Sequence, residues 1–296
     1  MLLGIAFALA QAFTWSITSI ILRNLSTHLD PFLVNGVRAA IGLLIIIPLI
    51  FLTGGQSDYR TLTATRVLLL GGSIAVGGVL GDAFFINSLR ILGVGRAFPI
   101  TNTYPLFTVL FSVVLLDERV TWGTMAGMML VMLGIYMVAR PKGRVQETES
   151  SLPTTQLIKG VLAALATAML WGLASVVLAI GLRGMNPIVA NSVRVPFVVA
   201  LCLLAAIQRR QLGVLRRLDR RTMGLLALAG ILGWGVGSSL FISAVQLAGP
   251  SKTAIVSAAA PLFAIPLSTI FMHERPNRYT LAGTILSVAG IALVVV

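Results

Sequence analysis

The sequence predicts an all-α integral membrane protein whose ten transmembrane helices form two inverted five-helix repeats. Three observations lead to this fold class: the composition, a series of ten apolar runs, and a duplication of one half in the other. The chain has 296 residues, of which 57% are hydrophobic and 10% are charged. A soluble domain carries about 25% charged residues, so this chain has too little polar surface to cover a soluble globule.

The ten apolar runs have the length that crosses a bilayer as a helix, about 20 residues. They lie near 2–22, 33–52, 67–89, 97–117, 120–139, 159–180, 188–207, 223–244, 253–272 and 278–296. Most links between them are short, so consecutive helices must be antiparallel. Only the polar stretch "RPKGRVQETESSLPTTQ" is typical of a linker. We therefore expect a first repeat over 1–139, a linker over 140–156 and a second repeat over 157–296.

The second half repeats the first at a constant offset of 156 residues, without a gap. "DPFLVNGVR" (30–38) matches "NPIVANSVR" (186–194), and "DERVTWGTMAG" (117–127) matches "HERPNRYTLAG" (273–283). Paired positions include Trp15 with Trp171, Asn35 with Asn191, Arg38 with Arg194, Phe85 with Phe241, and Glu118 with Glu274. Because each half holds five spans, an odd number, the second half must cross the membrane in the opposite sense. Inverted repeats are typical of transporters, whose substrate site lies near the midplane between the halves.

These residues carry a resemblance to a known family. The chain resembles the EamA-type exporters of the drug/metabolite transporter superfamily in three features: the two sets of five spans, the tryptophan in the first span of each half, and the proline and arginine that open each second span. "LLDERVTWGTMAGMMLVMLGIYMV" (115–138) fits the same pattern. The resemblance covers essentially the whole chain. It implies transport of small organic metabolites, often amino acids or related compounds, and commonly outward. Because the chain has no ATP-binding motif, we expect a secondary transporter or a uniporter of the cell membrane, which works by alternating access between the two repeats.

Two arginines and one aspartate stand inside apolar spans, where an unpaired charge is costly. Arg38 lies seven residues past Pro31, about 10 Å below the surface that holds the loops after odd-numbered spans. Asp82 lies at a similar depth in the third span, so Asp82 or Glu274 is the expected partner of Arg38. Asp82 is also the candidate for proton coupling.

The second repeat lacks this carboxylate, because Ser238 occupies the position that matches Asp82. Arg194 then has only Glu118 as a candidate partner, or it is open to a carboxylate of the substrate. For both arginines, snorkelling to the headgroups is the alternative.

The remaining cavity candidates are polar or aromatic. "FPITNTYPLF" (98–107) places Asn102 and Tyr104 between two prolines, which free backbone carbonyls that a cavity or a neighbouring helix must satisfy. Trp15 and Trp171 lie too deep to be interfacial anchors, so each either stacks on a substrate or packs in the core. The full set of expected cavity residues is Trp15, Asn35, Arg38, Asp82, Phe85, Asn102, Tyr104, Trp171, Asn191, Arg194, Ser238 and Phe241.

Other functional classes find little support in the sequence. The two histidines have no metal-ligand spacing, and neither a Walker A motif nor a GxSxG motif occurs, so we expect no enzyme, cofactor or metal site. The net charge of +13 is concentrated in loops, which favours contact with anionic headgroups rather than nucleic acid. The expected partners are the lipid bilayer, a small-molecule substrate and a coupling proton. The chain would act as a monomer or weak homodimer. A channel or lipid scramblase, or a membrane scaffold, remains the alternative.

The distribution of basic residues predicts the orientation. Loops after odd-numbered spans carry Arg23, Arg90, Arg96, Arg140, Lys142, Arg144, Arg209, Arg210, Arg216, Arg217, Arg220, Arg221, Arg275 and Arg278, whereas the other side carries Arg60, Arg66, Arg119, Arg183 and Lys252. This excess puts the odd-numbered loops in the cytoplasm and both termini outside. The family resemblance implies the opposite, with both termini inside.

Overall fold

The computed structural model describes residues 1–26, 29–138, 153–260, 262–263 and 278–295. Within these ranges the chain forms helices and no strand. Seven helical stretches are long and apolar enough to cross a membrane: Leu2–Leu22, Pro31–Leu52, Ala64–Leu92, Arg96–Leu116, Thr154–Leu182, Pro187–Gln208 and Arg220–Ala248. Trp122–Met137 and Leu281–Val295 are shorter apolar helices. Half of the expected ninth span, 253–272, lies outside the described residues.

The first half contains α1 (Leu2–Ser26), α2 (Pro31–Leu52), η1 (Gly55–Thr61), α3 (Ala64–Ile74), η2 (Ala75–Gly81), α4 (Asp82–Leu92), α5 (Val94–Thr101), α6 (Tyr104–Leu116) and α7 (Trp122–Val138). The second half contains α8 (Thr154–Leu182), α9 (Pro187–Gln208), η3 (Leu212–Arg217), α10 (Arg220–Ala229), η4 (Gly230–Gly237), α11 (Ser238–Ala248), α12 (Pro250–Ser257) and α14 (Arg278–Val295).

Matching helices begin with the same local chemistry. Asp30 caps α2 by accepting hydrogen bonds from the backbone of Phe32 and Leu33, and Asn186 caps α9 by accepting one from Ile188. A proline follows each cap, where its missing N–H costs nothing because that group has no helical partner. At the next matched position, Thr63 caps α3 and Asp219 caps α10. The repeat therefore extends to the signals that start each helix.

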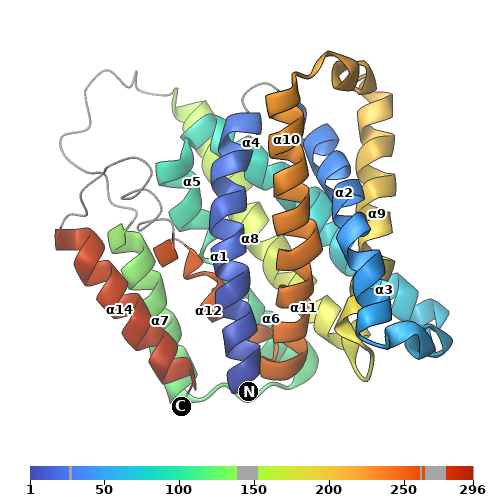
Figure 1. The fold of residues 1–296 in the computed structure, drawn as a ribbon. Coiled ribbons are helices and arrows are strands. Elements are labelled where there is room, and N and C mark those ends of the chain that lie inside the picture. Colours follow the sequence, from blue (N-terminus) through green and yellow to red (C-terminus); the bar gives the residue numbers. More distant parts are fainter. Residues whose placement is uncertain (27–28, 139–152, 261, 264–277, 296) are drawn as a thin grey trace.

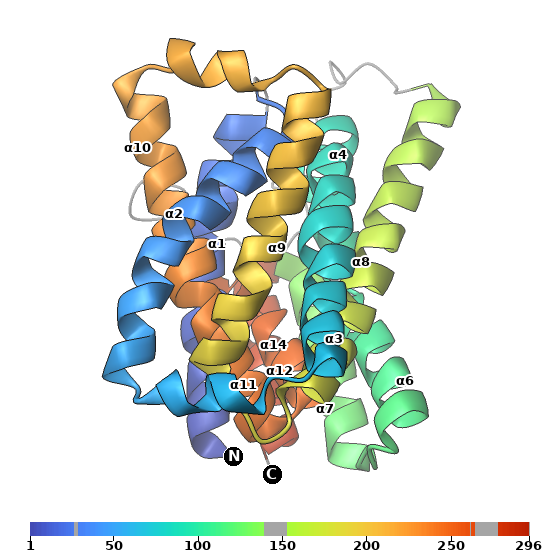
Figure 2. The ribbon, with the colours of Figure 1, turned by 90° about the vertical axis from the view of Figure 1, so that its right-hand side faces the viewer.

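The two halves are interlaced rather than separate. α1 packs against η4 and α11 of the second half, whereas α8 packs against η2 and α4 of the first. α2 contacts α9, and α7 contacts α14. Figures 1 and 2 show that matching helices run in opposite directions, so α1 begins at the same face at which α14 ends.

Glycines allow the close contact between α7 and α14. A Cβ on Gly127 would lie 2.5 Å from the carbonyl oxygen of Gly290, and one on Gly134 would overlap Ser287 and the carbonyl of Gly283. Gly127 matches Gly283 and Gly134 matches Gly290 at the offset of 156, so each glycine meets the counterpart of the other. Small residues of this kind let backbones approach closely inside a membrane.

Each third span is interrupted at the same place. α3 passes into the π-helical segment η2 before α4, and α10 passes into the π-helical segment η4 before α11. Seven of the fifteen residues in η2 and η4 are glycines, at positions 77, 78, 81, 230, 233, 235 and 237. Single π-helical turns inside α-helices are often found at functional sites. Here both lie in the middle of the bundle.

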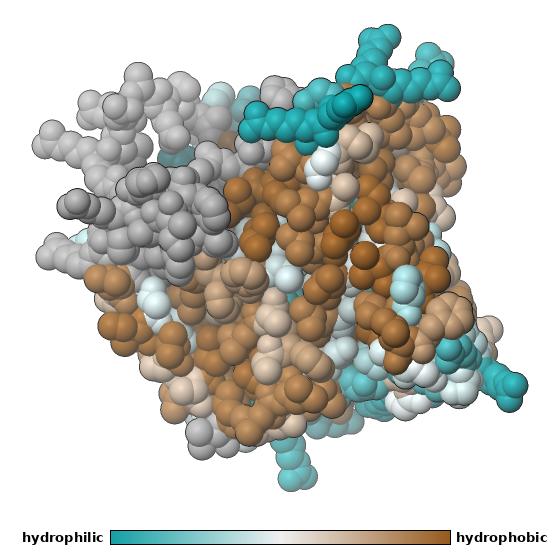
Figure 3. Space-filling view, in the orientation of Figure 1, coloured by the Kyte–Doolittle hydropathy of each residue, from teal (hydrophilic) through white to brown (hydrophobic). Residues whose placement is uncertain are grey.

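The outer surface suits a lipid environment. Large apolar side chains are exposed on several helices, including Leu52 (81%) on α2 and Trp122 (85%) on α7. Figure 3 shows a broad hydrophobic face, with hydrophilic side chains gathered toward the ends of the helices. A surface of this kind is stable against hydrocarbon and not against water.

Candidate functional site

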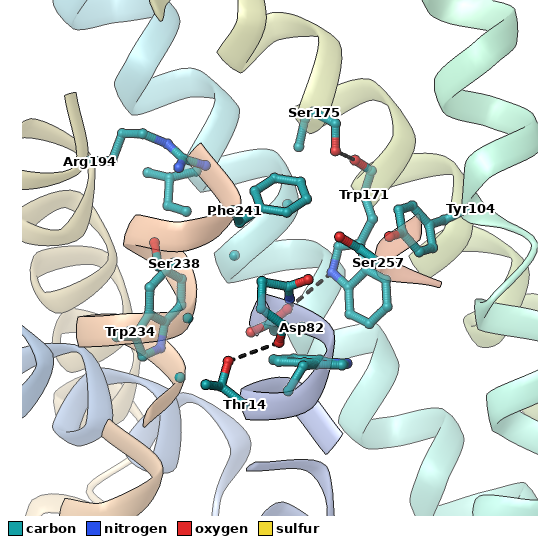
Figure 4. A pocket seen from close by; sticks show the side chains of 18 of the residues that line it. Thr14, Asp82, Tyr104, Trp171, Ser175, Arg194, Trp234, Ser238, Phe241 and Ser257 are labelled. Carbon is teal, nitrogen blue, oxygen red and sulfur yellow. Dashed lines mark hydrogen bonds between the residues drawn. The ribbon is translucent and has the colours of Figure 1, made fainter. Parts of the chain in front are cut away.

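A cavity of about 170 Å³ lies between the two halves and takes its walls from both. From the first half it is lined by Gln11, Thr14, Trp15, Arg38, Ile74, Gly77, Gly78, Asp82, Asn102 and Tyr104, and from the second by Trp171, Ala174, Ser175, Arg194, Gly233, Trp234, Gly237, Ser238, Phe241 and Ser257. In Figure 4, Arg194, Ser238 and Trp234 lie on one side and Trp171 and Tyr104 on the other, with Asp82 and Phe241 between them.

Most residues expected to form a cavity lie in this wall: Trp15, Arg38, Asp82, Asn102, Tyr104, Trp171, Arg194, Ser238 and Phe241. Asn35, Phe85 and Asn191 do not line it. They lie directly behind it, where Asn35 contacts Asp82, Asn191 contacts Ser238, and Phe85 packs against Trp15 and Trp171. These three side chains therefore position the wall rather than form it.

Asp82 is held by neutral donors. Trp171 Nε1 donates to one carboxylate oxygen over 3.1 Å, and Asn35 Nδ2 donates to the other over 3.4 Å. Asn35 in turn donates to the carbonyl of Gly78 over 2.5 Å and accepts from Trp234 Nε1 over 3.0 Å. Both tryptophans come from the second half, so the aspartate of the first half is oriented across the repeat interface.

The structure does not form the expected ion pair between Arg38 and Asp82. Among the described residues no carboxylate makes a salt bridge with Arg38, although its side chain is almost fully buried (1% exposed). Its Nε approaches the carbonyl of Ala229 at 3.5 Å, and its Nη1 has no hydrogen-bond partner. Depth along the helix was the basis of the expected pair. The expected pair does not form because the Asp82 carboxylate is turned toward Trp171 and Asn35. The other expected partner, Glu274, lies outside the described residues.

Arg194 occupies the matching place in the second half. Its Nε donates to the hydroxyl of Ser73 over 3.2 Å, and Ser73 is the counterpart of Ala229. Glu118, its expected carboxylate partner, instead accepts a hydrogen bond from Ser251 over 2.7 Å at the start of α12. Each arginine thus donates a hydrogen bond to the third span of the opposite half. In the described part of the chain, neither is in direct contact with a carboxylate.

The other end of the cavity is aromatic. Trp171 packs edge-on against Trp15 and Tyr104, with ring centroids 5.9 and 6.0 Å apart, and lies 5.1 Å from Phe85. Such T-shaped pairs are a favourable arrangement of aromatic rings. Both tryptophans therefore pack together and also line the cavity, and stacking on a substrate stays a prediction.

The fourth span breaks between α5 and α6, at Asn102 and Thr103. The polar side chains here add hydrogen bonds to the carbonyls of Phe98 and Ile100, which already accept from the backbone of Asn102 and Thr103. Asn102 Nδ2 donates to the carbonyl of Phe98 over 2.9 Å, and Thr103 donates to that of Ile100 over 2.7 Å. The polar residues of this segment stabilise the break first, and Asn102 lines the cavity in addition.

Sequence reasoning missed four polar or aromatic wall residues: Gln11, Thr14, Ser175 and Trp234. Gln11 had a usable signal, because a glutamine inside an apolar span is costly without a role, and its side-chain oxygen is buried without a partner. Trp234 is harder to find, because the glycines around it in "GILGWGVG" (230–237) favour close helix packing as the interpretation of this segment. The π-helical turn is what directs its indole toward Asn35.

Comparison with known proteins adds an independent finding. The sequence model of the EamA-like transporter family matches residues 2–140 and again residues 158–296. An "Uncharacterized transporter" of Archaeoglobus fulgidus is 24% identical over 294 residues, which cover 99% of this chain and 98% of that protein. "Solute carrier family 35 member G1" of Homo sapiens is 23% identical, over 97% of this chain and 77% of its own length.

A solved crystal structure shares the fold. Its chain superposes with a TM-score of 0.75 at 21% identity, and the match covers 99% of this chain and 94% of the other. At that identity the likeness concerns the arrangement of helices alone.

Proposed function

The chain belongs to the EamA-like transporter family and is a multi-pass membrane transporter rather than an enzyme, and from that premise we propose that it is a secondary exporter of small organic metabolites. Its cargo would be amino acids or related compounds. In this proposal ten spans form two inverted five-helix repeats, 1–139 and 157–296, joined by the linker 140–156. Transport proceeds by alternating access between them.

One observation carries the proposal: a cavity with three charged side chains in its wall is built from both repeats, within the apolar spans. Buried charged groups inside a membrane segment usually mark a substrate or ion pathway. Here Arg38, Asp82 and Arg194 all reach the same cavity, and matched π-helical segments flank it. A site between inverted repeats can be exposed to either side by rocking one repeat against the other.

Arg194 is proposed to bind a carboxylate of the substrate. It is 5% exposed, lines the cavity, and uses only its Nε on Ser73, so its terminal nitrogens remain for a ligand. Arg194→Ala should weaken binding of carboxylate-bearing substrates with little loss of folded protein. The measurement is substrate Kd beside the melting temperature of detergent-extracted protein. Unchanged affinity would contradict the assignment.

The function itself is tested by counterflow. Purified protein in liposomes loaded with a pool of unlabelled metabolites should accelerate entry of the labelled compound that it carries, by trans-stimulated exchange. A channel or scramblase would give flux without trans-stimulation, and a scaffold would give none. Either result would reject the carrier in favour of those alternatives.

A further inference from the structure

Among the described residues neither arginine of the cavity makes a salt bridge with a carboxylate. The cavity wall contains two arginines and one aspartate, and the carboxylate of that aspartate is hydrogen-bonded by Trp171 and Asn35. Arg38 is buried to 1% exposure with its Nη1 unpartnered. A buried guanidinium without a partner is strongly unfavourable, and it remains charged because its pKa is too high to lose the proton. The resting cavity therefore carries one more positive group than negative groups.

The space beside the Arg38 guanidinium is left open by a glycine in η4. A Cβ on Gly233 would lie 2.8 Å from Arg38 Nη2. The π-helical turn that contains Gly233 thus leaves room for the planar head group at the cavity wall. Ser257 adds a buried hydroxyl without a hydrogen-bond partner in the same wall.

The repeat places the two guanidinium groups at opposite depths. Arg38 and Arg194 each lie seven residues past the proline that starts their helix, about 10 Å in from opposite surfaces. In a hydrocarbon core about 30 Å thick, their Cα atoms are then separated by about 10 Å along the membrane normal. The two head groups are held at different helices, Arg38 at the carbonyl of Ala229 and Arg194 at the hydroxyl of Ser73, so a molecule with an anionic group at each end can contact both.

We propose that the cavity binds a small organic dianion, such as a dicarboxylate, with one acidic group on Arg38 and the other on Arg194. This inference rests on the proposed carrier function and names its substrate class. It also gives Arg38 a role other than the structural pairing expected from the sequence. The apolar middle of the ligand would lie against Phe241 and the indole of Trp171.

The test uses three probes of nearly equal size that lose one carboxylate at a time: succinate, its monoamide succinamate and its diamide succinamide. Binding to the full chain in nanodiscs is read from tryptophan fluorescence, since Trp15, Trp171 and Trp234 line the cavity. A hydrogen-bonded charge contributes about 1.5–3 kcal/mol, so we expect each lost carboxylate to weaken binding by about tenfold or more. No succinate binding, or equal binding of the diamide, would overturn the proposal.

Two variants test the pairing. In Arg38→Gln and in Arg194→Gln, the preference for succinate over succinamate should fall below about threefold, because one guanidinium can satisfy only one carboxylate. Arg220→Gln, at an exposed arginine that begins α10 outside the cavity, is the control and should keep the full preference. If only one of the two cavity arginines matters, the paired site is wrong.

A further variant keeps the proposal testable if the two arginine variants do not fold. Gly233→Ala keeps every charge and displaces the Arg38 guanidinium, so it should lower succinate affinity by about tenfold while succinamide affinity stays as it is. An unchanged succinate affinity in this variant would also overturn the proposal. Because binding at equilibrium needs no transport, loss of counterflow with intact succinate binding rejects the carrier alone. Counterflow of uncharged metabolites without succinate binding rejects the dianion site alone.

Discussion

At the scale of single residues, the side chain of Asn35 makes three hydrogen bonds beside the cavity. It joins Trp234, the carbonyl of Gly78 and Asp82, all within the buried interior. Its counterpart Asn191 contacts Ser238 and Ser239 instead, over 2.8 and 3.1 Å. The same residue type at matched positions therefore supports an indole and a carboxylate in one half and two hydroxyls in the other.

Asn35→Ala should be clearly more destabilising than Asn191→Ala. The first leaves a buried indole N–H and a backbone carbonyl without partners, at about 1–3 kcal/mol for each group. The second leaves serine hydroxyls, and Ser239 already donates to the carbonyl of Gly235 in its own helix. The measurement is the melting temperature of each variant in the same detergent. Equal losses would mean that the network around Asp82 contributes no special stability.

Asp82→Asn tests the proposed proton coupling. An asparagine can still accept from Trp171, so the site should remain assembled while the titratable group is lost. We expect accumulation driven by a pH gradient to disappear, and exchange of substrate down its own gradient to continue. Both are measured in the same proteoliposomes. Gradient-driven accumulation at the wild-type level would show that Asp82 does not carry the proton.

The site could be predicted from the sequence as far as residue type, spacing and duplication allow. Arg38, Asp82 and Arg194 stand out because a charge inside a span is costly without a function, and the repeat pairs the two arginines with each other. Their partners could not be predicted, since depth along a helix says nothing about the direction of a side chain. Asp82 faces Trp171, at 3.1 Å, and not the arginine at its own depth.

At the scale of helices, the π-helical segments were the feature that periodicity could not reveal. A glycine-rich run inside an apolar span predicts close packing, and the contacts of Gly77 with Ala174 and of Gly81 with Trp171 agree with that. The extra residue of a π-turn changes which side chains face inward, and this requires tertiary contacts. The caps at Asp30 and Asn186, by contrast, follow directly from the sequence.

Gly77→Ala should impair the contact between η2 and α8. Its new Cβ would lie 2.6 Å from the Cβ of Ala174, closer than two methyl groups can approach. Gly72→Ala is the matched control, because it lies five residues earlier in the same span with nothing within 4 Å. Both changes reduce backbone entropy of the unfolded chain equally, so the contact alone separates them. We expect a lower melting temperature and slower transport for Gly77→Ala, and neither for Gly72→Ala. Similar behaviour of the two would mean that η2 is not tightly held.

At the scale of the whole molecule, the interlaced packing makes the two halves interdependent. α1 of the first half lies against η4 and α11, and α8 of the second lies against η2 and α4, so neither half buries its own first helix alone. The cavity exists only where both halves meet. From an odd number of spans in each repeat, the sequence predicted that the halves cross the membrane in opposite senses with the site between them. It did not predict the interlaced packing, and for the orientation in the membrane the basic residues and the family resemblance disagree.

The orientation can be measured because the chain has a single cysteine, Cys202, which is buried. Cys202→Ser provides a background without thiols. Gly213→Cys, in an exposed turn with nothing within 4 Å, then reports the loop after the seventh span, and Ser57→Cys reports the opposite side at an exposed position in η1. The excess of basic residues predicts that Gly213→Cys is cytoplasmic. A membrane-impermeant maleimide added to intact cells should therefore label Ser57→Cys and leave Gly213→Cys unlabelled until the membrane is permeabilised. The reverse pattern would place both termini inside, as the family resemblance implies, and would mean that the arginines of 209–221 do not set the topology.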